Sequence, residues 1–530
     1  MKRTALPRLF FFPGLLALSL ACRGAEAGGL PGPEAPASAW ASEARPAGQS
    51  PSGATSAPGE AVEGALEIGD PYFPGLGSGG LDVQHYDLAL RVDVDSDEIA
   101  AEARLAVRAL EPLASFGLDL YGLEVETVSI DGQPATFERP AGATGPEGKV
   151  LPPSELVIRP ARPLASGSAF EVVVRYGGTP EPRPDASVPF LPGVGWSAMD
   201  SGIYVVAECI GASSWFPCND HPRDKATYAF RVSVAKPYVV AANGILVGVT
   251  EEEEARTYAF EARDPMASYL ATVNIAEFGQ FEAQGPRGIP VRTYHPTNAT
   301  EEELAPFRRQ PEVLAFLETR FGPYPFEAAG AVLSYENIGG ALECQTIPVY
   351  GRGCDLDVIV HELAHQWFGD AVSPDLWRDL WLNEGFASYA SWLWEEHANG
   401  AAAYESTARR TYGELRRRKV GSPFDPGVER LFGGRVYARG AMVLYGLRAE
   451  VGDEVFFEIL KRWAAERHDA NGSTADFTAH AARVAGRDLG PFFEAWLYAP
   501  VTPEVAAFEP LEPLPERGRR RGGDGEPGGG

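Results

Sequence analysis

The segment VIVHELAHQWFGD, residues 358–370, places two histidines and a glutamate inside an otherwise apolar run. Positions i and i+4 of a helix share one face, so His361 and His365 are expected to point at the same ion. Zinc binds imidazole nitrogen at about 2.0–2.1 Å, and a catalytic zinc ion commonly has three protein ligands and a water molecule. Glu362 projects differently and is expected to reach that water as a general base. The alternative is a buried helix whose two histidines make ordinary hydrogen bonds.

A third zinc ligand is available further along the chain. The segment WLNEGFASY places Glu384 at the start of the next helical pattern, with eighteen residues between it and His365. HELAH followed by NEGFA at this distance resembles the gluzincin metallopeptidases, and most closely the aminopeptidase N family, which includes leukotriene hydrolase. HYDLALRVD and SSWFPCNDHPRDKATYAFRV are similar to the opening strand and the β-domain signature of that family. The resemblance runs from about Leu81 to Pro500, and it implies one zinc ion per chain, bound by His361, His365 and Glu384.

The same resemblance implies residues that would bind a substrate. The segment GALEC matches the family's Gly-Ala-Met-Glu-Asn strand, so Glu343 would hold the free α-amino group of a peptide. Gly340 and Ala341 in that strand would line the peptide backbone. Glu208 matches a second amine-binding acid of the family, eight residues before the FPC turn.

Two further residues are assigned roles near the zinc site. Tyr437 in YARG matches the family's Tyr-x-Lys/Arg-Gly pattern, so its hydroxyl would donate to the oxyanion of the tetrahedral intermediate. The alternative for Tyr437 alone is an aromatic core residue on a helix. Asp379, five residues before Glu384, would either orient a zinc ligand or be a surface acid.

These residues imply a zinc-dependent aminopeptidase. Zinc would polarise the scissile carbonyl and lower the pKa of its water towards about 7, and Glu362 would pass the water's proton to the leaving amine. Since Glu208 and Glu343 would hold an ammonium group one residue from the cut, the expected substrates are peptides with a free N-terminus. The alternatives are a leukotriene-type epoxide hydrolase, a zinc endopeptidase and a non-catalytic surface binding protein. The last is expected to have lost Glu362, Glu384 or Tyr437, and the chain keeps all three.

The elements that must position these residues fall into two groups. Runs such as HYDLALRVDVD, FEVVVRY and YAFRVSV alternate with period two and predict a mostly antiparallel β domain over residues 81–285. After about Glu301 the pattern becomes helical, which predicts a mostly helical catalytic domain over residues 286–500. The predicted fold class is therefore α+β and multidomain. The resemblance implies a saddle-like β domain and a thermolysin-like catalytic domain, without the large helical C-terminal domain of longer family members.

Composition bounds the partners of the chain. Its 530 residues are 45% hydrophobic and 22% charged, which are globular values. The formal net charge of −27 argues against nucleic acid as a partner. The basic RGRRR run lies in a Gly-rich tail, residues 501–530, which is expected to be disordered. The oligomeric state does not follow from these observations.

The N-terminus predicts export. Basic residues precede the apolar run LFFFPGLLALSLA, which is typical of a signal peptide over residues 1–22. The ending LSLAC resembles a bacterial lipobox, so Cys22 would be lipidated and the protein would be anchored to a membrane of the cell envelope. The alternative is a plain signal peptide and a soluble periplasmic or secreted protein. Residues 23–80, rich in Ala, Pro, Gly and Ser, are expected to form a disordered linker.

The four cysteines after Cys22 allow three disulfide pairings, and spacing alone does not choose among them. The resemblance favours one pairing, because Cys209 and Cys344 directly follow the two acids that would bind one ammonium. A Cys209–Cys344 disulfide is therefore one of two hypotheses for these cysteines. Against it, neighbouring residues of a strand point to opposite faces, and the alternative is four reduced thiols. The four residues are Cys209, Cys218, Cys344 and Cys354.

Overall fold

The computed structural model of the chain describes residues 61–142, 151–189 and 191–509. The predicted signal peptide, Cys22 and residues 23–60 of the predicted linker lie outside the described residues, as do residues 510–530. No described helix is both long enough and apolar enough to cross a membrane.

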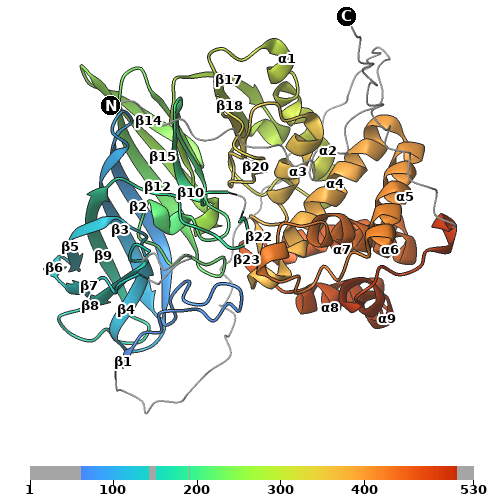
Figure 1. Cartoon of the computed structure of the whole chain (residues 1–530), viewed down its shortest axis with the longest axis horizontal. Helices are drawn as coiled ribbons and strands as arrows, with labels where there is room; N and C mark the ends of the chain where they lie inside the picture. The colour runs from blue at the N-terminus through green and yellow to red at the C-terminus, as the bar shows by residue number, and fades with distance from the viewer. Residues whose placement is uncertain (1–60, 143–150, 190, 510–530) are drawn as a thin grey trace, which may run out of the picture. The chain divides into compact units, whose positions relative to one another are not determined.

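The first half of the described chain is built from β-sheets, drawn in blue to green in Figure 1. The alternating runs form strands as predicted, because their apolar faces are buried: Leu88, Phe230 and Val172 are fully buried, each on a different strand. The largest sheet has eight strands, and its β12 and β2 pair in parallel while the other pairs are antiparallel. Its spatial order is β14 (Ile245–Glu251), β15 (Ala255–Ala267), β12 (Lys225–Ala235), β2 (Leu81–Asp93), β3 (Glu98–Ala109), β9 (Ala169–Gly178), β5 (Glu124–Ile130) and β6 (Gln133–Pro134).

Two four-stranded sheets complete this β-rich half. One carries Glu208 just beyond its strand β11, and the other includes the first strand of the described chain. The first sheet has the order β10 (Gly195–Met199), β11 (Gly202–Val206), β16 (Val273–Ala276) and β13 (Val239–Ala242). The second has the order β1 (Val62–Glu63), β4 (Leu113–Asp119), β8 (Glu155–Arg159) and β7 (Thr136–Glu138).

A mixed five-stranded sheet opens the second half. It has the order β17 (Phe278–Gln284), β18 (Pro290–Pro296), β19 (Ala329–Leu333), β21 (Val349–Tyr350) and β20 (Ala341–Leu342). The sequence had placed the domain boundary at residue 285. Strand β17 pairs along its whole length with β18, so this sheet already begins at Phe278. The change from one sheet to the next falls between β16 and β17.

Helices make up the rest of the second half, drawn in yellow to red in Figure 1. They confirm the predicted order of a β-rich part followed by a helical part. Helix α5 buries an apolar stripe of Tyr404, Ala408, Tyr412 and Leu415, and its arginines lie outside this stripe. The helices are α1 (Glu301–Leu304), α2 (Gln310–Phe321), α3 (Leu356–His365), α4 (Trp381–Asn399), α5 (Ala401–Arg418), α6 (Gly440–Val451), α7 (Asp453–Glu466), α8 (Thr474–Ala485) and α9 (Gly490–Phe493), and a parallel pair joins β22 (Val372–Pro374) to β23 (Ala470–Gly472).

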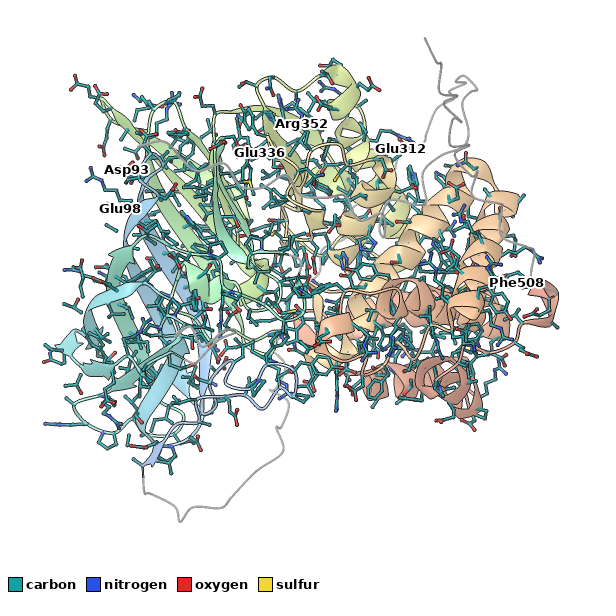
Figure 2. The ribbon with its side chains drawn as sticks, in the orientation of Figure 1. Asp93, Glu98, Glu312, Glu336, Arg352 and Phe508 are labelled. Carbon is teal, nitrogen blue, oxygen red and sulfur yellow. The ribbon has the colours of Figure 1, made fainter. Side chains whose placement is uncertain are left out.

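Two predicted disordered segments are partly ordered. Residues 61–80, here called the N-terminal arm, form β1 and bury Phe73 and Leu76 in the main core, so the prediction of a disordered linker up to residue 80 is wrong for this part. Residues 501–509 also pack on the body, because Phe508 is buried against Tyr412 (Figure 2). Neither segment has a clear helical or strand-like pattern of apolar residues, so no sign of order was visible in the sequence. Their apolar side chains Phe73, Leu76 and Phe508 are ordered by contacts with residues far away in the chain.

Candidate active site

Helix α3 brings the two histidines of the HELAH segment onto one face. Asp355 begins the helix by accepting hydrogen bonds from the backbone N–H groups of the next turn, as a good N-cap residue does. Ile359 and Leu363 are fully buried and pack in the main core. His361 and His365 are four residues apart, and their rings lie 4.7 Å apart between centroids. The helical spacing argument from the sequence is therefore confirmed.

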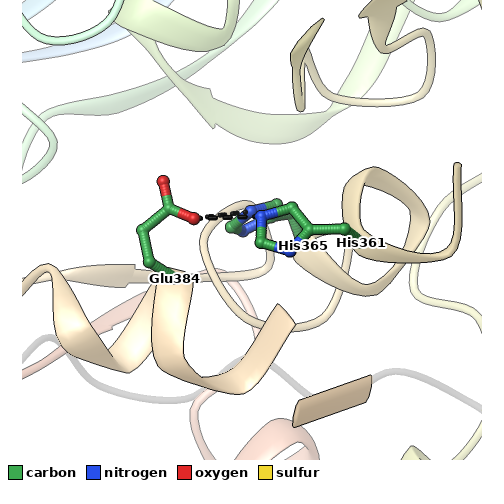
Figure 3. Close-up of side chains that lie close together, drawn as sticks. All are labelled: His361, His365 and Glu384. Carbon is green, nitrogen blue, oxygen red and sulfur yellow. Dashed lines mark hydrogen bonds and ion pairs between the residues drawn. The ribbon is translucent and has the colours of Figure 1, made fainter. Parts of the chain in front are cut away.

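A glutamate of helix α4 meets both imidazoles. The Oε2 atom of Glu384 lies 3.0 Å from Nε2 of His361 and 3.4 Å from Nε2 of His365 (Figure 3). One potential ligand atom from each residue lies within 4.8 Å of the other two. The other ring nitrogen of His365, Nδ1, donates to the backbone carbonyl of Phe368 at 3.1 Å. This bond fixes the orientation of the ring and leaves Nε2 directed at Glu384.

The charges of this cluster stabilise an ionised Glu384. Burial raises the pKa of that carboxyl, but the nearby His365 and the contacts with both imidazoles lower it below its ordinary value. Burial lowers the pKa of His361. Burial also lowers the pKa of His365, but the charges of Glu343 and Glu384 outweigh it and raise that pKa well above its ordinary value. The negative charges of Glu343 and Glu384 therefore favour a positively charged group at this site.

The donor set fits zinc. Two imidazole nitrogens and one carboxylate oxygen are ligands that catalytic zinc accepts, with one position left for water. Ligands about 2.1 Å from a tetrahedral ion are about 3.4 Å apart, and the two contacts to Glu384 Oε2 are 3.0 and 3.4 Å long. The hydrogen bond from His365 to a backbone carbonyl is the kind of outer contact that orients a metal-binding imidazole. Both contacts to Glu384 are therefore close to the spacing between two ligands of one zinc ion.

Three more acids surround the cluster. Carboxylate oxygens of Glu362 and Glu343 lie within 4.8 Å of each other and of a ring nitrogen of His365. Burial raises the pKa of Glu362 well above its ordinary value, and the charges of Glu343 and Glu384 raise it further. Burial also raises the pKa of Glu208 well above its ordinary value, and Glu343 is the next cause. The structure therefore brings the predicted acids together, although Glu208 and Glu343 lie far apart in the sequence.

Glu208 and Glu343 share a second feature. Each is buried, and each has one carboxylate oxygen, Oε1, that finds no hydrogen-bond partner among the described residues. Leaving a carboxylate oxygen buried and unpartnered is costly, so such atoms point to a ligand that supplies donors.

The strand that precedes Glu343 lies at a sheet edge. In the described part of the chain, β20 pairs with β21 on one side only, and it contains Ala341. Gly340 is exposed, and its carbonyl accepts from the Gly351 N–H at 2.8 Å. An edge strand offers free backbone groups to a peptide that lies beside it. Gly340 and Ala341 therefore lie at a sheet edge, and their contact with a peptide backbone stays a prediction.

Tyr437 reaches the zinc ligands from a π-helical turn, Arg435–Arg439, that leads into α6. Its hydroxyl donates to Oε1 of Glu384 at 2.6 Å, and its ring stacks on that of His361 with 5.9 Å between centroids. Burial and the charge of Glu384 raise the pKa of Tyr437 well above its ordinary value. The phenol therefore stays protonated at neutral pH and can donate.

The structure contradicts both hypotheses for Asp379 and one of the two hypotheses for the cysteines. Asp379 accepts from the backbone N–H and the hydroxyl of Thr474, so it is neither a surface acid nor a partner of a zinc ligand. Cys209 and Cys344 are free thiols and do not form a disulfide. Both are buried, and they lie in separate core clusters.

Sequence reasoning missed three polar residues around the site, of which Gln366 and Asp370 are buried and Lys225 is half-buried. Gln366 directly follows His365, and its Nε2 donates to the Glu343 carbonyl at 2.9 Å. Lys225 on β12 donates to the carbonyls of Asp370 and Ala371 at 2.7 and 3.0 Å. Both carboxylate oxygens of Asp370 are buried without a partner among the described residues. The signal was present, since Gln366 and Asp370 interrupt the same apolar run as the histidines.

Comparisons with known proteins agree with this site. Residues 351–496 match the Peptidase family M1 domain, and residues 198–270 match the Peptidase M1 N-terminal domain. The crystal structure of an M1 zinc metallopeptidase from Deinococcus radiodurans superposes with a TM-score of 0.75 at 30% identity, covering 84% of this chain and 99% of that one. A mutant of the Deinococcus radiodurans enzyme bound to the substrate Tyr-Ser-Ala superposes with a TM-score of 0.74 at 30% identity, covering 83% of this chain and 99% of that one.

Curated relatives are longer than this chain. The probable aminopeptidase 1 of Sulfurisphaera tokodaii is 25% identical over 459 residues, which are 80% of this chain and 54% of that protein. Aminopeptidase N of Lactobacillus delbrueckii subsp. lactis is 28% identical over 324 residues, which are 55% of this chain and 38% of that protein. The chain thus spans about half of the first relative and less of the second.

The fold and the site define a zinc metallopeptidase, with His361, His365 and Glu384 as its zinc site. The chain belongs to peptidase family M1.

Proposed function

We propose that the protein is a zinc-dependent aminopeptidase that removes the N-terminal residue from peptides. The observation that carries this proposal is the pair of buried, unpartnered carboxylate oxygens of Glu208 and Glu343. Glu343 lies against Glu362 and His365, and the charge of Glu208 interacts with those of Glu343 and Glu384. An ammonium group supplies both the donors and the positive charge that these atoms lack.

The amine pocket determines where the chain is cut. With the α-amino group held by Glu208 and Glu343, only the first peptide bond can lie at the zinc site. An acetylated N-terminus carries no charge and leaves both carboxylates unpaired, which is strongly unfavourable in a buried site. The pocket thus favours an exopeptidase over an endopeptidase.

Glu362 acts as the general base in this proposal. When bound, zinc supplies Lewis-acid chemistry that polarises the scissile carbonyl and makes the attacking water more acidic. Glu362 accepts the proton of that water and returns it to the nitrogen of the leaving peptide. Its buried position near Glu343 raises its pKa, which suits a group that must both take up and release a proton.

Tyr437 stabilises the transition state. Its hydroxyl is protonated and already lies 2.6 Å from a zinc ligand, so it is positioned to donate to the oxygen that becomes negatively charged. The free edge of β20, with Gly340 and Ala341, aligns the peptide backbone by adding it as a further strand. The binding of Tyr-Ser-Ala by the Deinococcus radiodurans relative supports a peptide substrate.

Aminoacyl-arylamide hydrolysis tests this function. The purified protein is expected to hydrolyse alanyl- and leucyl-arylamides, to lose activity with a zinc chelator and to regain it with added zinc. An otherwise identical N-acetylated arylamide serves as the matched control and is expected to remain intact. Cleavage of the acetylated substrate, or hydrolysis of a lipid epoxide with no arylamide hydrolysis, would overturn the proposal.

We further propose that the enzyme is exported and held at a membrane of the bacterial cell envelope through lipid on Cys22. The support is the LSLAC ending of the apolar N-terminal run. Cys22→Ser is expected to move the protein from the membrane fraction to the soluble fraction, and a variant that stays with the membrane would contradict the anchor.

A further inference from the structure

The N-terminal arm contacts both halves of the described chain. In the β-rich half, the Ser78 N–H donates to the Asn219 side chain at 2.6 Å, and the Asn219 amide donates back to the Ser78 carbonyl. In the helical half, the arm reaches Trp377 and the loop at residues 425–427. It lies outside the two segments that match the family's domains, which begin at residues 198 and 351.

Asp70 of the arm caps the helical segment that carries Glu384. Its Oδ2 accepts from the backbone N–H of Trp377 at 2.9 Å. Trp377 begins a short 3₁₀ turn that runs directly into α4, and Glu384 lies in the first turn of α4. The residues at the two N-cap positions, Leu376 and Leu380, make no side-chain cap. A carboxylate from a remote part of the chain therefore satisfies an N–H group that the local sequence leaves free.

Asp70 is held rigidly in this position. It is 2% exposed, and its Oδ1 accepts from the Tyr72 N–H at 2.8 Å. The Arg223 N–H donates to Nδ1 of His221, so Nε2 of this ring is the donor to Asp70, at 3.3 Å. Burial raises the pKa of Asp70, but the hydrogen bonds from His221, Trp377 and Tyr72 lower it below its ordinary value.

The arm also holds the side chain of Trp377. Phe73 packs edge-on against the fully buried indole, with 6.1 Å between ring centroids. A second contact fixes the loop that precedes Tyr437, because the Tyr72 hydroxyl donates to Asp425 at 2.6 Å and accepts from the Gly427 N–H at 2.8 Å. Two residues of the arm thus contact Trp377: Asp70 accepts a hydrogen bond from its backbone N–H, and Phe73 packs against its ring.

We propose that the N-terminal arm is a positioning element of the zinc site, in which Asp70 and Phe73 set the start of α4 and thereby the place of Glu384. A metal site needs ligands held close to their productive positions by the groups behind them. Glu384 lies only seven residues after Trp377, on one continuous helical segment. Loss of the cap frees that segment to shift and weakens zinc binding. The inference rests on the zinc site, and it does not require peptides to be the substrate.

Zinc affinity of the folded protein tests the proposal. Asp70→Ala removes the cap and is expected to weaken zinc binding at least tenfold, measured by competition with a chelator of known affinity. Asp70→Asn keeps one oxygen acceptor but sets its amide NH2 against one of the donors that meet Asp70, so its loss of zinc affinity is expected to lie between those of the wild type and Asp70→Ala. Phe73→Leu serves as a second variant if Asp70→Ala does not fold, with an expected loss of about threefold. The matched control is Thr300→Ala, which removes the cap of α1, a helix that carries no site residue.

The outcomes separate positioning from general destabilisation. Unchanged zinc affinity in folded Asp70→Ala or Phe73→Leu protein would overturn the proposal, as would an equal loss in Thr300→Ala. A drop in melting temperature alone, without a change in zinc affinity, would assign the arm a purely structural role. If the wild type binds zinc in an Asp70-dependent manner but cleaves no arylamide, the proposed function fails and this inference stands.

Discussion

Gln366, at the C-terminal end of helix α3, forms a hydrogen bond with the backbone of Glu343, just after strand β20. Replacing Gln366 by leucine removes this link between α3 and Glu343. The side chain is fully buried and makes three hydrogen bonds, to the Glu343 carbonyl, the Thr346 N–H and the Tyr324 hydroxyl. Leucine has a similar size but no polar atom. At about 1 kcal/mol for each hydrogen bond lost, the free energy of unfolding should fall by about 3 kcal/mol. Glu343 should also lose its alignment, so the KM for alanyl-arylamide should rise about tenfold, equivalent to about 1.4 kcal/mol of binding.

Gln310→Leu is the matched control for this experiment. Gln310 is also fully buried, and its amide donates to the Thr293 hydroxyl and the Phe307 carbonyl, away from the zinc site. Its loss should lower the free energy of unfolding by about 2 kcal/mol and leave KM unchanged. Urea unfolding and steady-state kinetics at a temperature where all three proteins are folded measure both quantities. If Gln366→Leu raises KM no more than Gln310→Leu does, the link to the amine pocket is refuted.

Three further changes probe the site and the core. Glu362→Gln should keep its zinc but lose about 100- to 10,000-fold in kcat, because it removes the proton acceptor; turnover near the wild-type rate would exclude that role. Tyr437→Phe should lower kcat about 100- to 1,000-fold with a smaller change in KM, and a pure KM effect would leave Tyr437 a packing residue. Burial raises the pKa of Asp119 to about 7, with a further contribution from Asp220. The folded state thus binds this proton more tightly than the unfolded state, and the resulting stability, complete below about pH 4, is lost as the pH rises through about 7. Asp119→Asn should flatten the fall in melting temperature between pH 5 and 8, and an unchanged slope would contradict this assignment.

Local patterns determined the elements and the zinc ligands. The alternation in HYDLALRVDVD places Tyr86 and Leu88 on one buried face, because side chains of a strand alternate with a period of two. The spacing of His361 and His365 places both imidazoles on one helical face for the same kind of reason. Glu384 followed from the resemblance of HELAH and NEGFA, at their distance in the chain, to a known metallopeptidase family. In each case the information lies within a short stretch of chain.

Only the tertiary structure decided which distant segments meet. The fold brings Glu208 close enough to Glu343 for their charges to interact, and it places Cys209 and Cys344 in separate core clusters. It also orders residues 61–80, which were expected to be a linker, as the N-terminal arm. It also showed that Asp70 supplies the cap that the start of the Glu384 helix lacks. No local period encodes such contacts, because they depend on how the sheets and helices pack and on the ordering of chain segments between them. The sequence alone therefore determined the chemistry of the zinc ligands, and the packing of the whole chain determined how the surrounding residues hold them.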